Sequence, residues 1–201
     1  MKRVLMLAAC VAALAATPAF ASTEGAYLSG NGGVSFTPDL TLKSNTLGNL
    51  TEHTDTGYTF GGTAGYDYGN GWRVQLDSQY TRQKVSSLSG AATNGHVSST
   101  SLILGAQKDL TEGTTVTPYV GAGIGLQNVG GQVNGYEGRA WKPAYQAEAG
   151  LRGDLSQNVS LYTEYRFSQS ASASMDNGAD LAHQHFSDHG LLAGLTYHIG
   201  Q

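Results

Sequence analysis

Apolar residues alternate with polar or small residues along much of the chain, and the pattern is clearest between Thr115 and Phe167. Within this stretch, mostly apolar residues occupy every second position in three runs, at 116–126, 145–151 and 159–167. A period of two places successive side chains on opposite faces of a β-strand. The stretch therefore predicts three consecutive strands of about ten residues, the length of a tilted strand that crosses a bilayer.

The same alternation predicts five further strands. A Gly-Asn-Gly sequence at 69–71 predicts a tight hairpin turn between two of them. In the strand expected near Ser98–Lys108, Ile103 interrupts an otherwise polar face. The five strands are expected at about Ala26–Phe36, Gly57–Tyr68, Trp72–Thr81, Ser98–Lys108 and Gly190–Ile199.

Long polar connections alternate with short turns along the predicted strands. The long ones are expected as loops at 37–56, 86–97, 128–142 and 169–188, and the short ones at 69–71, 109–114 and 154–158. An even strand number with this alternation is typical of bacterial outer-membrane barrels, whose long loops face outwards and whose short turns face the periplasm. The predicted fold is all-β, an eight-stranded antiparallel up-and-down transmembrane β-barrel with both termini in the periplasm.

The first residues have the pattern of a secretory signal peptide. Lys2 and Arg3 precede an apolar run at 4–16, and Ala19-Phe20-Ala21 fits the small-x-small cleavage rule. We therefore expect a signal peptide at 1–21 and a barrel domain at 22–201. A lipoprotein-type box ending at Cys10 leaves lipidation of that cysteine as an alternative.

Composition narrows the class of protein further. Of the 201 residues, 13% are charged, against roughly 25% in ordinary soluble domains. Removing Lys2 and Arg3 leaves 9 basic against 15 acidic residues, a net charge of −6. Such a chain lacks the clustered basic residues of a nucleic-acid footprint, so we expect no nucleic-acid partner.

Seven charged residues lie at the alternate strand positions, on the face opposite to the apolar residues. We call this shared set of odd or even positions their parity. An eight-stranded barrel is just filled by side chains, and buried charges need opposite partners. These residues therefore predict a charge network in the lumen, either as a packed polar plug or as a gated narrow conduit for water or small ions. They are Asp67, Arg73, Asp77, Glu148, Arg152, Glu164 and Arg166.

Parity alone also allows a soluble lipocalin-type barrel, with the apolar residues inside. Aromatic residues near the expected strand ends favour the membrane version, because transmembrane barrels carry aromatic girdles at both interfaces. The predicted interface aromatics are Tyr58 and Tyr80 towards one end and Tyr68 and Trp72 at the other.

Histidines and a serine raise two chemical alternatives. His183, His185 and His189 fall in or next to the last long connection, and His183-x-His185 could bind a metal on an extended segment. No fixed third ligand accompanies them, so we expect no metal site and no cofactor. His185 and Ser187 are close in sequence but in a predicted loop, so we expect no catalytic residues and no enzymatic activity.

The residues at 117–125, which read TPYVGAGIG, and the run at 159–167, which ends Glu-Tyr-Arg-Phe, carry a family resemblance. The sequence resembles the small OmpA/OmpX-type outer-membrane β-barrels, in particular the porin-family or surface-antigen branch, over essentially the whole chain after residue 21. Gly194, Tyr197 and Ile199 look like the C-terminal signal that the barrel-assembly machinery reads. The chain departs from that pattern by ending on Gly200-Gln201 rather than on an aromatic residue.

The resemblance implies a monomeric, surface-exposed structural protein in the outer membrane of a Gram-negative envelope. Its expected partners are outer-membrane lipids and lipopolysaccharide, with the barrel-assembly machinery and periplasmic chaperones during biogenesis. A narrow porin-like channel for small solutes or ions is the alternative. A lipid A-modifying enzyme is a third function, for which the sequence shows no motif.

Overall fold

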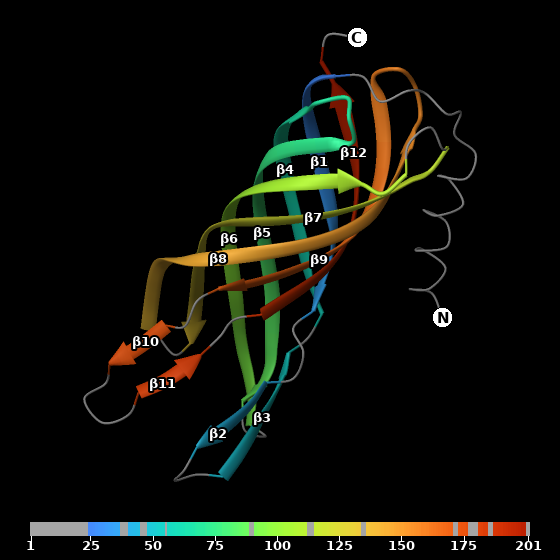
Figure 1. Cartoon of the computed structure of the whole chain (residues 1–201). Coiled ribbons are helices and arrows are strands. Elements are labelled where there is room, and N and C mark those ends of the chain that lie inside the picture. The colour runs from blue at the N-terminus through green and yellow to red at the C-terminus, as the bar shows by residue number, and fades with distance from the viewer. Residues whose placement is uncertain are drawn as a thin grey trace.

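Eight of the strands in the computed structural model form a closed antiparallel barrel (Figure 1). Each pairs with its neighbours, and β1 pairs with β12 to close the sheet. The structure describes residues 24–36, 40–44, 48–54, 56–88, 91–111, 115–133, 136–170, 173–176, 181–184 and 187–199. The barrel strands are β1 (Gly25–Phe36), β4 (Gly57–Asp67), β5 (Trp72–Leu88), β6 (Ala91–Asp109), β7 (Thr117–Val133), β8 (Tyr136–Asp154), β9 (Val159–Ser170) and β12 (Ser187–His198).

The predicted eight-stranded up-and-down barrel is therefore confirmed. None of the described residues forms a helix long and apolar enough to span a membrane. The predicted signal peptide at 1–21, with Cys10, lies outside the described residues, as does Gly200-Gln201.

Two of the predicted long loops, at 86–97 and 128–142, are wrong. β5 and β6 stay paired up to Leu88 and Ala91, and β7 and β8 stay paired up to Val133 and Tyr136. These segments are rich in Ser, Asn and Gly, so neither face of the strand is consistently apolar. A ladder of backbone hydrogen bonds needs no apolar face, and the alternating pattern therefore stops before the strands do.

The other two predicted loops, at 37–56 and 169–188, contain hairpins. The first holds β2 (Leu40–Ser44) and β3 (Gly48–Thr54), and the second holds β10 (Ala173–Asp176) and β11 (Leu181–Gln184). Both lie at the same end of the barrel, towards the bottom and lower left of Figure 1. We call this the hairpin end and the opposite end, where the short turns lie, the turn end.

The predicted tight turn between β4 and β5 is confirmed. Gly69 and Gly71 have φ angles of 69° and 76°, which side chains other than glycine rarely adopt. The Asp67 carboxylate accepts a hydrogen bond from the Gly69 amide at 2.9 Å, and the Tyr68 amide donates to the Trp72 carbonyl at 3.0 Å. The turn thus fixes the register of β4 against β5.

The barrel has an apolar outer face and a polar inner face. Ile124 is 73% exposed and Leu104 61% exposed on the outside. By contrast, most of the fully buried side chains are polar or charged and point inwards. This polarity matches a transmembrane barrel and excludes the lipocalin alternative, in which the apolar side chains would fill the interior.

The four predicted interface aromatics lie on the outer face. Tyr68 and Trp72 are about half exposed at the turn end. Tyr58 is similarly exposed further along β4, and Tyr80 packs against Phe60 with ring centroids 5.2 Å apart. Their contact with a membrane interface stays a prediction.

Candidate functional site

Glycines make room for large side chains inside this narrow barrel. Three tyrosines point inwards, and each lies against a glycine directly opposite it on the next strand. A Cβ atom added to any of these glycines would come within 2.4–2.6 Å of the tyrosine ring. The pairs are Tyr27 with Gly65, Tyr119 with Gly150, and Tyr162 with Gly194.

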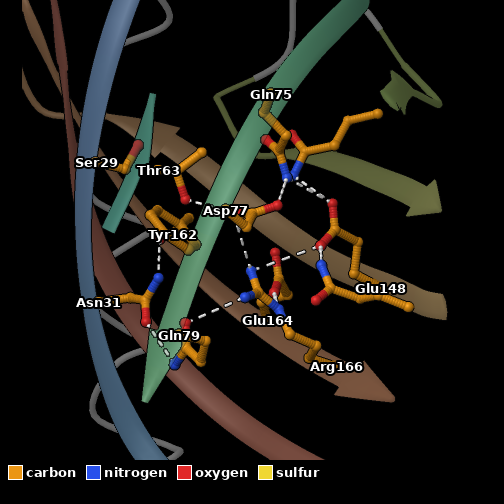
Figure 2. Close-up of polar contacts among 12 residues, drawn as sticks. Ser29, Asn31, Thr63, Gln75, Asp77, Gln79, Glu148, Tyr162, Glu164 and Arg166 are labelled. Carbon is orange, nitrogen blue, oxygen red and sulfur yellow. Dashed lines mark hydrogen bonds and ion pairs between the residues drawn. The ribbon is translucent and has the colours of Figure 1, made fainter. Parts of the chain in front are cut away.

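Arg166 crosses the middle of the lumen (Figure 2). It starts on β9 and its guanidinium donates to Gln79 Oε1 at 3.2 Å on β5, four strands away in either direction around the barrel. The same guanidinium donates through Nε to Glu164 Oε1 at 2.7 Å. Its Nη2 lies 3.5 Å from Glu148 Oε2 and 3.7 Å from Asp77 Oδ1. We call Arg166 with these three carboxylates the central cluster.

Neutral side chains complete the hydrogen bonds of these carboxylates. Glu148 Oε1 accepts from the amides of Gln75 at 3.0 Å and Gln107 at 2.8 Å, and Glu148 Oε2 accepts from Gln146 at 2.8 Å. Tyr119 donates its hydroxyl to Glu164 Oε2 at 2.9 Å. Both oxygens of Glu148 and of Glu164 are therefore hydrogen-bonded, although the central cluster holds three acids against one arginine.

A second cluster lies near the turn end. Arg73 and Arg152 both donate to Asp109, one to each carboxylate oxygen, with the Arg152 bond at 2.7 Å. Asp67 lies 3.8 Å from Arg73 Nε. The sequence pattern predicts Asp109 in a turn, but it is the last residue of β6. Its parity with the buried Gln107 could have revealed it as a lumen residue.

A third polar group closes the hairpin end of the lumen. Ser35 and Gln83 both donate to Asp188 Oδ1, the amide of Gln83 at 2.9 Å. Asp188 lies within a segment predicted as a loop, but it belongs to β12 and is 7% exposed. The alternating pattern of that strand is clear only from Gly190 onwards, so the sequence pattern does not include Asp188 among the lumen charges.

The structure places all seven sequence-predicted lumen charges in the interior, each 6% exposed or less. It divides them between two clusters rather than one network. Asp77, Glu148, Glu164 and Arg166 form the central cluster, and Asp67, Arg73 and Arg152 gather around Asp109. Tyr119 joins the clusters, because its ring lies 5.3 Å from the Arg73 guanidinium and its hydroxyl reaches Glu164.

Ile103, which breaks the polar pattern of its strand, also points into the lumen and is fully buried. Its Cγ2 atom would lie 2.6 Å from a Cβ at Gly123 on the neighbouring strand. Because Gly123 has no side chain, the Ile103 side chain fits into the lumen among the polar side chains.

Two small cavities flank Arg166, each of about 20 Å³. The turn-side cavity is lined by Arg73, Arg152 and Arg166 together with Glu164 and neutral polar groups. The hairpin-side cavity is lined by Arg166, Asp188 and neutral amides and hydroxyls. Since one water needs roughly 10–15 Å³, each cavity has room for about one or two waters rather than a column of solvent.

The alternative of His185 with Ser187 lies outside the described residues, because His185 does. Two other histidines contact hydroxyl groups, without catalytic geometry. His189 lies on the outer face, where its Nδ1 is 2.5 Å from the Tyr165 hydroxyl. Inside the turn end, the Ser160 hydroxyl donates to Asp154 at 2.7 Å and lies 3.2 Å from His198 Nε2. A hydrolase needs the histidine between the acid and the nucleophile, whereas here the serine is in the middle and is 1% exposed.

Metal binding by the last histidines is not visible in the structure. The side chains of His183 and His185 lie outside the described residues. Among the side chains that are described, no group of three or more histidines, cysteines and acids is placed to hold a metal ion.

The predicted assembly-signal residues divide between the two faces of β12. Tyr197 and Ile199 are about half exposed on the outer face, next to the end of the strand. Gly194 faces inwards and receives the ring of Tyr162. Recognition by the assembly machinery stays a prediction.

An apolar outer face around a closed ring of eight antiparallel strands, with a charged interior, defines a small transmembrane β-barrel. The chain belongs to the family described as the outer membrane protein beta-barrel domain, whose sequence profile matches residues 6–198. Membership of this family places the protein in the outer membrane. No curated protein sequence matches the chain.

Solved structures of other outer-membrane proteins share the fold. Neisserial surface protein A, NspA, is 19% identical, with a TM-score of 0.62 over 89% of this chain and 100% of that one. OprG from Pseudomonas aeruginosa is 13% identical, with a TM-score of 0.56 over 89% and 99%. AlkL, whose structure was determined in lipid bilayers, is 20% identical, with a TM-score of 0.54 over 92% and 95%. At these identities the likeness concerns the fold alone.

Proposed function

We propose that the protein is a surface-exposed structural barrel of the Gram-negative outer membrane, with a lumen closed by side chains. The observation that carries the proposal is Arg166, which reaches from β9 to Gln79 and Asp77 on the opposite wall. A conduit through this point would have to displace a guanidinium that is held by three carboxylates. The two cavities of about 20 Å³ fit a closed interior.

In this proposal, a signal peptide at 1–21 directs export, and periplasmic chaperones and the barrel-assembly machinery insert the chain as a monomer. The hairpin end faces outwards and the turn end faces the periplasm. The β2–β3 and β10–β11 hairpins then extend beyond the outer leaflet, where lipopolysaccharide and external ligands are accessible. The outer face contacts membrane lipids.

Recording from the purified, refolded protein in a planar bilayer tests the closed lumen. We expect no conductance steps above the baseline of the bilayer alone, in either polarity. Discrete, reproducible steps at the wild-type sequence would contradict the structural role and favour a channel.

A narrow channel for small ions or solutes is the second candidate function. It is favoured by the position of the cavities, which lie on the two sides of the same side chain, Arg166. If this side chain is a gate, replacing Glu164 and Arg166 with glutamine changes the conductance. If it is part of a plug, the same variants change thermal stability and leave the bilayer at baseline.

A further inference from the structure

The buried charges of the lumen do not balance. Among the described side chains, three arginines are buried in the lumen against six acids. The acids are Asp67, Asp77, Asp109, Glu148, Glu164 and Asp188. Because an uncompensated buried charge is costly, further positive charge inside the barrel or at its mouth, as a bound cation or as protons, would stabilise it.

The central carboxylates accept hydrogen bonds from neighbouring donors. Both oxygens of Glu148 accept from glutamine amides, and both oxygens of Glu164 accept from Tyr119 and Arg166. Asp77 accepts from the Thr63 hydroxyl at 2.5 Å and from the Gln75 amide at 2.8 Å. A bound cation would add to the compensation that these donors and Arg166 already supply.

The hairpin-side cavity is the place that suits a cation. The turn-side cavity is lined by three arginines, whereas the hairpin-side cavity combines one arginine with Asp188 and neutral oxygen-bearing side chains. One of these, Gln127, is 3% exposed, and its carbonyl oxygen Oε1 has no hydrogen-bond partner. A buried carbonyl without a donor calls for a cation or a water.

We propose that this cavity binds a monovalent cation, Na⁺ or K⁺, through the Gln127 carbonyl, the Asp188 carboxylate and the neighbouring hydroxyls. Carbonyl, carboxylate and hydroxyl oxygens are ligands for hard cations. A divalent ion would require several carboxylates or a full shell of oxygens, and this cavity has a single carboxylate. The bound ion offsets part of the negative charge of the lumen.

Lys142 is the internal competitor for this role. It pairs in register with Gln127, has the inward parity of Gln146 and Glu148, and is half-buried. Its ammonium group could therefore approach the same cavity from the hairpin end. Removing the charge of Lys142 should strengthen binding of the external cation, because a competing positive charge is lost.

The test is thermal unfolding of the refolded full chain in zwitterionic detergent, in NaCl, KCl or choline chloride at one ionic strength. Choline is too large for the cavity. We expect Tm in Na⁺ or K⁺ to exceed Tm in choline by about 3–6 °C. This is the shift for a chain of this size when the free cation concentration is roughly ten times its Kd. Equal Tm values in all three salts would overturn the proposal.

Three variants locate the effect. Gln127→Met should abolish the difference between salts, and Lys142→Met should enlarge it. Gln107→Met is the matched control, because Gln107 is also a buried amide but lines the turn-side cavity, and it should keep the wild-type difference. Loss of the difference in Gln107→Met as well, or a difference that appears only in Lys142→Met, would overturn the site as proposed.

Discussion

Replacing Arg166 with glutamine removes the guanidinium from the central cluster and leaves three carboxylates without their shared ion partner. The arginine contacts Glu164 at 2.7 Å, Glu148 at 3.5 Å and Asp77 at 3.7 Å. The formal net charge of the cluster changes from −2 to −3. All four side chains are nearly inaccessible to solvent, so water cannot screen the change.

The expected cost is about 3–5 kcal/mol, the usual effect of removing one partner from a buried ion pair. That is a large part of the roughly 5–15 kcal/mol by which proteins are stable. Glu164→Gln alone lowers the negative charge and leaves an oxygen that can accept from Arg166, so its cost should stay below about 1 kcal/mol. The double variant restores a net charge of −2, and a coupling energy of about 1–3 kcal/mol is expected.

Urea unfolding in lipid vesicles measures these differences. Tryptophan fluorescence and the different gel mobilities of folded and heated protein report the two states. A free energy of unfolding of Arg166→Gln within about 0.5 kcal/mol of the wild type would refute the assignment of a buried charge cluster. Strict additivity of the two single variants would refute the direct contact between Arg166 and Glu164.

Three further predictions concern side-chain packing and lipid contact. Gly150→Ala puts a Cβ 2.5 Å from the Tyr119 ring and should cost about 1–3 kcal/mol in urea unfolding, whereas Gly30→Ala, with open space around it, should cost almost nothing; equal effects would contradict the tight fit. Ile124→Arg should lower the free energy of unfolding in vesicles by about 2–4 kcal/mol if that outer side chain lies near the bilayer midplane. An unchanged free energy of unfolding would count against lipid contact at this position. Ile103→Ala should cost about 2–5 kcal/mol by opening a cavity in the lumen, and an unchanged free energy of unfolding would show that this side chain does not fill the interior.

The period-two pattern was sufficient to predict the barrel, because each crossing strand has one face towards lipid and one towards the lumen. It failed where this contrast ends. β5 to β8 continue beyond the membrane-crossing part with polar, charged and small residues at positions of both parities, so the pattern predicts their paired extensions as loops.

The candidate site shows the same limit of sequence reasoning. Parity identifies inward-facing charges such as Arg166, but it does not show which inward-facing residues on other strands lie close to them. It therefore could not show that Arg166 reaches Gln79 on the opposite wall, or that Arg73 and Arg152 share Asp109 in a separate cluster. Those partners depend on the closure of the sheet and on its register, which the sequence pattern leaves open.

Exchange of the Arg166 Nε proton with solvent tests the closed lumen most directly. It can be followed by NMR on the refolded, ¹⁵N-labelled protein in lipid, with the resonance assigned by its loss in Arg166→Gln. A proton donated to Glu164 at 2.7 Å and excluded from bulk water should exchange far more slowly than that of an exposed arginine. Exchange as fast as in a solvent-exposed guanidinium would show that water passes this level freely, and would contradict the account of a lumen closed by Arg166.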